Sequence, residues 1–563
     1  MTYVRSRRDF LRLGWKLGAG LALPAGLLGC GGGENSSSLT GETFVEPRRF
    51  QSIGGELDVT LRIAYFSTTL KGKAVTLRAM NASIPAPTLS VNAGDTLRIR
   101  VVNELPPNPP SNEPAKHLRY PNSTNLHTHG LHVTPGLVAP GVYGDFVMDD
   151  PSLGVQPGQT RQHEYRIGLD HPLGAYWYQP HLHGSAAMQV GSGMAGALLV
   201  KGDIDLVPEI AAAVERVFVF QSPIINSSGA LESFTQVSDD PFNEMPLLIN
   251  GVRRPRIIMR RQEVQNWHFI NAAIFNFVNL TLDGHALQVD SQDGNTRRSM
   301  LGVGPDADKG VVLAPGNRAS VVVQAIDTPG TYYLRTRRWD IGTIMYDDIL
   351  AEIVVVDPSA RMTLPSGPLP VPAKLASITD EEFASAGGLK RTIVMRTVFN
   401  DFQEPITVPP ASLVVHPGTE LDDWIFETGP TGLADKVFAL GSASGQASLA
   451  LGLPSEYIRF QSSRALKQTV ALGSVEEWTI LNMNFVGHVF HVRINPFEVI
   501  SINGMPVDAY WADTIGLPPN GSPANPTSVT FRTRFRDFAG ATLMHCHMIA
   551  HEDMGMMQTV EIV

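Results

Sequence analysis

Short apolar runs separated by turn-forming residues recur along the whole chain, and one arrangement of them occurs three times. Each copy has an eight-residue run rich in apolar residues that ends in asparagine; these runs are residues 96–103, 264–271 and 475–482. Each copy also has a later run that opens with glycine, at Gly174, Gly330 and Gly540. Short runs bounded by turn signals predict β-strands, and three copies at this spacing predict three β-sandwich domains.

The limits of these domains follow from changes in composition. We predict domains at residues 44–203, 210–357 and 385–563. A short helical-looking segment near residues 206–215 joins the first two domains. The proline-rich residues 358–384 are typical of a linker and join the second domain to the third.

Composition supports this reading and excludes one class of partner. The chain has 563 residues, which is too many for one ordinary core, and it is rich in glycine (52) and proline (41), as all-β proteins with many turns are. Its net charge is −10, and no basic run occurs after residue 50. Nucleic acid is therefore not expected as a partner.

Residues 1–30 are predicted to be an export signal rather than part of the fold. Ser6-Arg7-Arg8-Asp9-Phe10-Leu11-Arg12 has the twin-arginine pattern, and the apolar run that follows ends at Cys30, as in a bacterial lipoprotein cleavage site. Residues 31–43 would then be a flexible tether. The alternative is a plain signal peptide with a chance cysteine. We expect a periplasmic or envelope protein that meets the membrane only through a lipid on Cys30.

Histidines gather in four clusters that indicate a metal centre. The clusters are His127 with His129, His181 with His183, His488 with His491, and the run His545-Cys546-His547 with His551 and Met556. A cysteine, a histidine five residues on and a methionine five further are the ligand types of a blue copper site. On a strand, His545 and His547 point away from Cys546, so this segment can serve two metal sites. With Cys30 lipidated and Cys546 on metal, no disulfide remains.

With these motifs the chain resembles the three-domain multicopper oxidases, the family of laccases, bilirubin oxidases and bacterial cuprous oxidases. The resemblance implies an all-β fold of three cupredoxin-like Greek-key sandwiches, with copper bound at a type 1 site and at a type 2/type 3 cluster between the first and third domains. It implies type 1 ligands at His488, Cys546, His551 and Met556. It implies type 2 ligands at His127 and His491, and type 3 ligands at His129, His181, His545 and His547.

Two positions depart from the family's pattern. The third motif normally ends in histidine where this chain has Arg493, which cannot lose its proton and cannot bind copper. The second motif normally has histidine where this chain has Gln179. His183 would replace it only if the following loop slipped by two residues. Either both changes are tolerated drift, or the type 3 pair is incomplete and oxygen reduction is impaired.

The resemblance implies an oxidase. A small reductant, phenol-like or a metal ion, would reduce the type 1 copper near His488 and His551, and Cys546 would relay electrons through His545 and His547 to the site that reduces oxygen. Glu552 or Asp553 is expected to supply protons or to orient a ligand, the alternative being an ordinary surface turn, and Asp145 is a weaker proton-donor candidate. The C-terminal methionines other than Met556 are expected to pack in the core, and no methionine-rich insertion points to cuprous ions.

Two other functions compete with this one. An envelope copper-binding or electron-transfer protein would keep the type 1 site and have a degenerate oxygen site. A structural protein of this fold would have lost copper altogether, which the intact Cys546, His551 and Met556 argue against.

Overall fold

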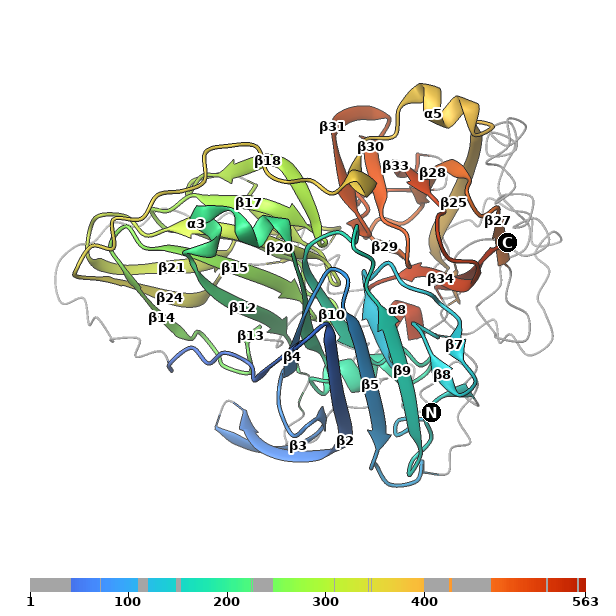
Figure 1. Cartoon of the computed structure of the whole chain (residues 1–563), viewed down its shortest axis with the longest axis horizontal. Coiled ribbons are helices and arrows are strands. Elements are labelled where there is room, and N and C mark those ends of the chain that lie inside the picture. Colours follow the sequence, from blue (N-terminus) through green and yellow to red (C-terminus); the bar gives the residue numbers. More distant parts are fainter. Residues whose placement is uncertain are drawn as a thin grey trace, which may run out of the picture.

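The computed structural model describes residues 42–563 except for 71, 110–119, 148–152, 224, 226–246, 308, 343, 346, 399–424, 428–466, 523–524 and 554–555. The described strands form seven sheets, six of which are five- or six-stranded and belong in pairs to three consecutive parts of the chain. Figure 1 shows these parts as a blue-to-teal, a green-to-yellow and an orange-to-red body. The expected all-β fold is confirmed. The predicted export signal and most of the tether lie outside the described residues.

Two sheets make up the first part of the chain. One has the order β1-β4-β11-β10-β6 and the other the order β3-β2-β5-β9-β8-β7. The strands are β1 (Arg49–Gln51), β2 (Glu56–Leu70), β3 (Lys73–Met80), β4 (Ala86–Asn92), β5 (Thr96–Asn103), β6 (His127–His129), β7 (Leu137–Ala139), β8 (Val142–Tyr143), β9 (Thr160–Arg166), β10 (Gly174–Gln179) and β11 (Gly196–Lys201). Helix α2 (Ala186–Gly191) lies between β10 and β11.

The second part repeats this plan, and its described residues contribute to none of the groups of side chains that could bind a metal ion. Its sheets have the orders β13-β12-β15-β20-β17-β18 and β14-β24-β21-β16-β19, and a separate ribbon pairs β22 with β23. The strands are β12 (Val214–Gln221), β13 (Leu248–Ile249), β14 (Arg256–Arg260), β15 (Val264–Asn271), β16 (Val278–Leu282), β17 (Leu287–Gln292), β18 (Asn295–Val303), β19 (Val311–Leu313), β20 (Arg318–Gln324), β21 (Gly330–Thr336), β22 (Trp339–Asp340), β23 (Ile344–Met345) and β24 (Asp348–Val356).

The third part carries the C-terminal metal-binding run. Its sheets have the orders β26-β25-β28-β33-β30-β31 and β27-β35-β34-β29-β32. The strands are β25 (Leu389–Val398), β26 (Ile425–Glu427), β27 (Lys467–Val470), β28 (Val475–Asn482), β29 (Val489–Val492), β30 (Phe497–Ile502), β31 (Met505–Ala512), β32 (Thr514–Gly516), β33 (Thr527–Arg534), β34 (Gly540–Cys546) and β35 (Met557–Ile562). Helix α8 (Ile549–Asp553) follows β34.

The segments between these parts contain only short helices. The predicted helix near residues 206–215 is a 3-10 turn η2 (Asp203–Leu206) followed by α3 (Pro208–Ala211), and β12 already begins at Val214. Residues 358–384 contain η3 (Ala373–Leu375) and the start of α5 (Asp380–Ser385). The structure has no helix, in the described ranges, that is both long and apolar enough to cross a membrane.

The threefold repeat is visible in three buried asparagines at the ends of β5, β15 and β28. Asn103, Asn271 and Asn482 each donate their side-chain amide to two carbonyl oxygens and accept from the backbone N–H two residues later. Each therefore satisfies loop backbone groups that would otherwise be buried without partners. The strands that end in these residues have the limits that the sequence predicts.

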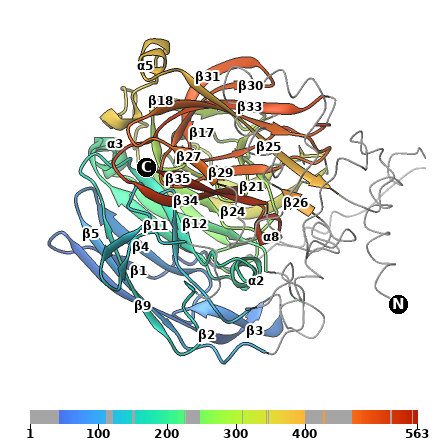
Figure 2. The same ribbon diagram turned by 90° about the vertical axis from the view of Figure 1, so that its right-hand side faces the viewer.

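Apolar side chains fill the space between the paired sheets and also join the three parts. The largest core cluster contains Trp478 and Phe531 from one sheet of the third part and Cys546 from the other, and it extends to Val190 of α2 and Phe275 of the second part. Figure 2 shows α2 and α8 next to each other, so the C-terminal run lies against the first part of the chain. The first and third parts therefore meet as the sequence predicts.

Candidate metal centre

Strand β34 presents its side chains to two different surroundings, as strand alternation requires. The Cys546 sulfur lies 3.7 Å from His488 Nδ1 and 3.5 Å from His551 Nδ1. On the other face, His545 Nε2 lies 3.1 Å from His181 Nε2, and His547 Nε2 lies 3.1 Å from His129 Nδ1. One three-residue segment therefore contributes to two separate groups of metal-binding side chains.

The first group, His488, Cys546 and His551, is suited to copper. The His488 Nε2–H donates to Asn484 Oδ1 at 2.9 Å, which leaves Nδ1 facing the sulfur. Burial lowers the pKa of His488 to about 3 and raises that of Cys546 to about 12, so a bound metal is needed to hold the thiolate. The Cys546 N–H donates to the Met556 carbonyl at 3.0 Å, and the Met556 side chain is fully buried beside this group.

The second group joins the first and third parts of the chain through His127, His129 and His491. The rings of His129 and His491 stack with centroids 4.0 Å apart. Burial holds the pKa of all three histidines below the usual value, so they are neutral and able to bind metal. The buried Nε2 atoms of His127 and His491 have no hydrogen-bond partner within the described residues, as expected of nitrogens reserved for a metal ion.

The third group consists of His181, His545 and Glu552. Glu552 lies on α8, and its carboxylate oxygens are 3.1 Å from His181 Nε2 and 3.2 Å from His545 Nδ1. All three side chains are at most 1% exposed. The sequence places Glu552 near the metals but does not show that it belongs to a ligand group.

Gln179 is the last residue of β10 and lies beside metal-binding histidines. It pairs with His127 across β10 and β6, and its Nε2 lies 3.3 Å from His547 Nε2. Its buried Oε1 accepts no hydrogen bond within the described residues. His183 lies on the half-buried turn before α2 and is not part of any of the three groups. Gln179 therefore lies beside His547, which contacts His129, and the loop after Pro180 does not bring His183 into any of the three groups.

Arg493 directly follows the end of β29 (Val492), two positions after His491. Its side chain is 2% exposed. Burial is the main cause that lowers the pKa of His127, His181 and His545, and the positive charge of Arg493 lowers it further. The guanidinium therefore sits within the metal centre, where it cannot serve as a ligand.

The other two acidic candidates anchor structure. Asp145 accepts from His127 Nδ1–H at 2.9 Å and from the Thr128 N–H at 2.8 Å. Burial alone would raise the pKa of Asp145, but His127 and Arg493 lower it, so Asp145 is a poor proton donor at neutral pH and instead orients His127. Asp553 accepts from the N–H groups of Gly184 and Ala187, both at 2.7 Å, and so holds α2 against α8.

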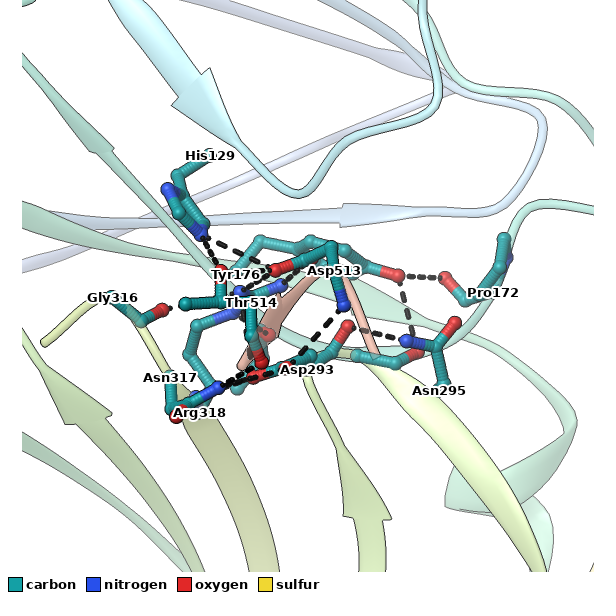
Figure 3. A network of polar contacts seen from close by, with 12 residues as sticks. His129, Pro172, Tyr176, Asp293, Asn295, Gly316, Asn317, Arg318, Asp513 and Thr514 are labelled. Carbon is teal, nitrogen blue, oxygen red and sulfur yellow. Dashed lines mark hydrogen bonds and ion pairs between the residues drawn. The ribbon is translucent and has the colours of Figure 1, made fainter. Parts of the chain in front are cut away.

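A buried ion-pair network from the second part of the chain supports the metal centre (Figure 3). Arg318 on β20 donates to both carboxylate oxygens of Asp513, at 2.7 and 2.6 Å. Asp513 accepts from Thr514, whose hydroxyl lies 3.0 Å from His129 Nε2, and the Asp513 carbonyl accepts from His491 Nδ1–H at 2.8 Å. Sequence reasoning missed these residues because each is a single polar residue with no recognisable motif around it.

Asp293 completes this network. It accepts from the backbone N–H of Arg318 at 2.9 Å and from Asn317. Burial and the neighbouring Asp513 raise the pKa of Asp293 to about 7, whereas Arg318 outweighs burial at Asp513 and lowers its pKa. Asp513 is therefore the carboxylate that carries the charge opposite Arg318.

Two glycines permit this close packing. Gly130 and Gly316 both have φ near +90°, which side chains other than glycine rarely adopt. A Cβ on Gly130 would lie 2.2 Å from Arg318 Nη2, and a Cβ on Gly316 would lie 2.9 Å from the His547 ring. The backbone of the second part thus packs directly on a metal-binding histidine.

Comparison with known proteins agrees with this geometry. Three sequence profiles of the multicopper oxidase family match residues 116–204, 224–348 and 455–563. The chain is 22% identical to multicopper oxidase mco of Staphylococcus haemolyticus over 491 residues, covering 86% of this chain and 83% of the relative. It is 23% identical to Laccase-2 of Botryotinia fuckeliana, covering 94% and 87%. A multicopper oxidase structure from Campylobacter jejuni superposes with a TM-score of 0.65 at 21% identity, covering 93% and 95%.

Proposed function

The chain belongs to the multicopper oxidases, and from this premise we propose that it oxidises a small reductant at a type 1 copper site and reduces oxygen at a trinuclear site. His488, Cys546, His551 and Met556 would hold the type 1 copper, and the remaining histidine groups would hold the cluster. The observation that carries this proposal is the division of β34, where Cys546 faces one group while His545 and His547 face the others.

Copper bound to these residues would supply one-electron redox chemistry at one end and oxygen reduction at the other. The protein's contribution is arrangement. Cys546 is joined to His545 and His547 by a few covalent bonds, which is a short path for electrons. Asp145 orients His127, and Asp513 orients His491, so that each ring turns its Nε2 inward.

We propose that electrons reach the type 1 site beside His551. In that ligand group His488 is buried, whereas His551 is partly exposed and lies against Phe275, with ring centroids 6.2 Å apart. Phe275 itself is buried in the core, so the exposed edge of His551 is where a small organic molecule can approach this group. A phenol-like reductant is therefore the first candidate.

A metal-ion reductant is the second candidate. One relative is named a laccase, and the similar structure from C. jejuni is described as a metallo-oxidase. The chain has no methionine-rich insertion, and the described C-terminal methionines Met544, Met548 and Met557 are buried in the core. This arrangement favours the organic reductant over cuprous ions.

The test is to load the protein without residues 1–30 with copper, count copper ions, record the visible spectrum and measure oxygen uptake with a phenol. We expect about four copper ions per chain, a blue band and uptake. A blue band with fewer ions and no uptake would show an electron-transfer protein with a degenerate oxygen site instead.

We also propose that the protein is exported by the twin-arginine route and anchored at the envelope through Cys30. The support is the sequence alone: Arg7-Arg8, the apolar run after them and the cysteine where that run ends. Replacing Arg7 and Arg8 by lysine should hold the precursor in the cytoplasm. Cys30→Ala should abolish labelling by a radioactive fatty acid without preventing export, and persistent labelling would exclude this anchor.

A further inference from the structure

The third ligand group places a carboxylate where the family's pattern leads us to expect histidine. His181, His545 and Glu552 bring their donor atoms within 4.8 Å of one another, from the loop after β10, from β34 and from α8. His545 Nε2 and Glu552 Oε1 each lie 3.1 Å from His181 Nε2, whereas Glu552 Oε2 lies 3.2 Å from the other ring nitrogen of His545, Nδ1. One donor atom from each residue therefore lies within reach of a single metal ion.

The group also explains how the chain accommodates Arg493. A histidine at position 493 would be a neutral ligand, whereas Arg493 brings a fixed positive charge and no donor electron pair. Its side chain is buried, so its charge is not screened by solvent. The Glu552 carboxylate supplies a donor atom and a negative charge. Arg493 and Glu552 together therefore leave the net charge around the metal unchanged.

We propose that Glu552 is a direct metal ligand, which completes a two-histidine, one-carboxylate site with His181 and His545 in place of the histidine that Arg493 replaces. This inference rests on the proposed function, since it concerns one metal position of the proposed cluster. Two histidines and a carboxylate are a ligand set found for divalent zinc and iron. The oxygen donor disfavours cuprous copper, so this position holds a divalent ion more tightly than a monovalent one.

The experiment measures metal binding rather than turnover. Copper affinity is determined by competition with a chelator for the wild-type protein, E552Q, R493H and the double variant, with E381Q as the control because Glu381 is exposed and far from the group in sequence. Loss of a group that only orients a ligand costs about 10–100-fold in affinity. We expect E552Q to weaken the binding of one metal ion per chain by more than about 100-fold, with the type 1 blue band and the thermal midpoint of the metal-free protein retained.

The double variant provides the second criterion. In E552Q/R493H the new imidazole replaces the lost oxygen, so the last metal ion should return, whereas E381Q should not differ from wild type. Retention of all metal ions by E552Q, or a loss smaller than about 100-fold, would overturn the ligand role. E552D, which keeps the carboxylate, should bind more tightly than E552Q if the folded state is intact, and equal affinity would also overturn it.

The wild-type protein separates this inference from the proposed function. If it binds copper, is blue and consumes oxygen while E552Q keeps every metal ion, only the inference fails. If the wild-type protein shows neither a blue band nor oxygen uptake, the proposed function itself fails. Zinc offered together with copper under reducing conditions should occupy one position per chain in the wild type and none in E552Q.

Discussion

Gln179 and Arg493 differ in what they do to the metal centre, although both stand at family ligand positions. Gln179 keeps a possible oxygen donor, and its amide contacts His547. Arg493 offers no donor atom. Glu552, however, contacts His181 and His545, the two histidines that a histidine at position 493 would have joined. The metal position beside His129 and His547 therefore has weaker ligands than the position beside His181 and His545.

The first prediction concerns that position. Gln179→His should strengthen binding of the metal ion shared with His129 and His547 by at least about 10-fold and raise oxygen uptake, because imidazole is a better copper ligand than an amide oxygen. Metal affinity and uptake are measured together. Gln159→His, on an exposed turn, is the control. Unchanged affinity in Gln179→His would mean that this side chain does not face the metal.

At the scale of single elements, one buried ion pair joins β20 to the start of β32 beside the metal centre. Arg318 is the first residue of β20, and Asp513 directly precedes β32. Arg318 is fully buried, and it is held by Asp513 and, at a longer distance of 3.6 Å, by Asp293. Removing one partner of a buried ion pair lowers the stability of the fold, because the remaining charge is neither paired nor solvated. The contact between the second and third parts therefore depends on an interaction that is also close to His129 and His491.

The second prediction follows from this burial. Arg318→Met should lower the free energy of unfolding by about 3–5 kcal/mol and weaken metal binding by about 10–100-fold. Arg335→Met is the matched control, since its partner Asp283 and Arg335 itself are about 30% exposed and such pairs contribute about 0–1 kcal/mol. Calorimetry measures the unfolding of both variants. Equal destabilisation of the two would contradict the structural role of Arg318.

At the scale of the whole molecule, Glu215 connects the first and second parts of the chain. Its carboxylate contacts Arg49 and Lys201 of the first part and lies 3.0 Å from His268 Nε2 of the second. An apolar cluster that includes Trp177 and Ile270 packs at the same boundary. Burial alone would raise the pKa of Glu215, but His268 and Lys201 lower it overall.

The third prediction is a pH dependence with a definite sign. Because the pKa of Glu215 is lowered on folding, its contribution to stability is present above the ordinary value of 4.5 and is lost as pH falls below it. Glu215→Gln should cost about 1.5–3 kcal/mol near pH 7 and progressively less below about pH 4. Glu104→Gln, whose Arg62 pair is exposed, should show little effect at either pH. A difference independent of pH would refute the assignment.

The fourth prediction concerns the metal ions, which join the first and third parts. Histidines from both parts converge in two of the ligand groups, so bound copper should stabilise their contact. Binding at a thousandfold excess over Kd contributes about 4 kcal/mol per site. Removing copper with a chelator should lower the thermal midpoint, and adding copper back should restore it. An unchanged midpoint would show that the parts associate without metal.

How much the sequence predicts depends on the range of the interactions involved. The strands that end in Asn103, Asn271 and Asn482 and those that begin at Gly174, Gly330 and Gly540 were predictable, because a strand's pattern lies within a few consecutive residues. The opposite orientation of Cys546 and its two histidines was predictable for the same reason. The His183 alternative could be stated but not decided, because a slip of two residues preserves the alternation of faces.

The sequence by itself determined the all-β fold, the type 1 ligand run and the absence of a family ligand at positions 179 and 493, since each is written in local spacing. Only the tertiary structure decided that Glu552 joins His181 and His545 while Asp553 faces α2, because adjacent residues on a short helix point in different directions. It also decided that Arg318 supports Asp513 from 195 residues away. Such a contact depends on how whole sandwiches pack together, which no local pattern encodes.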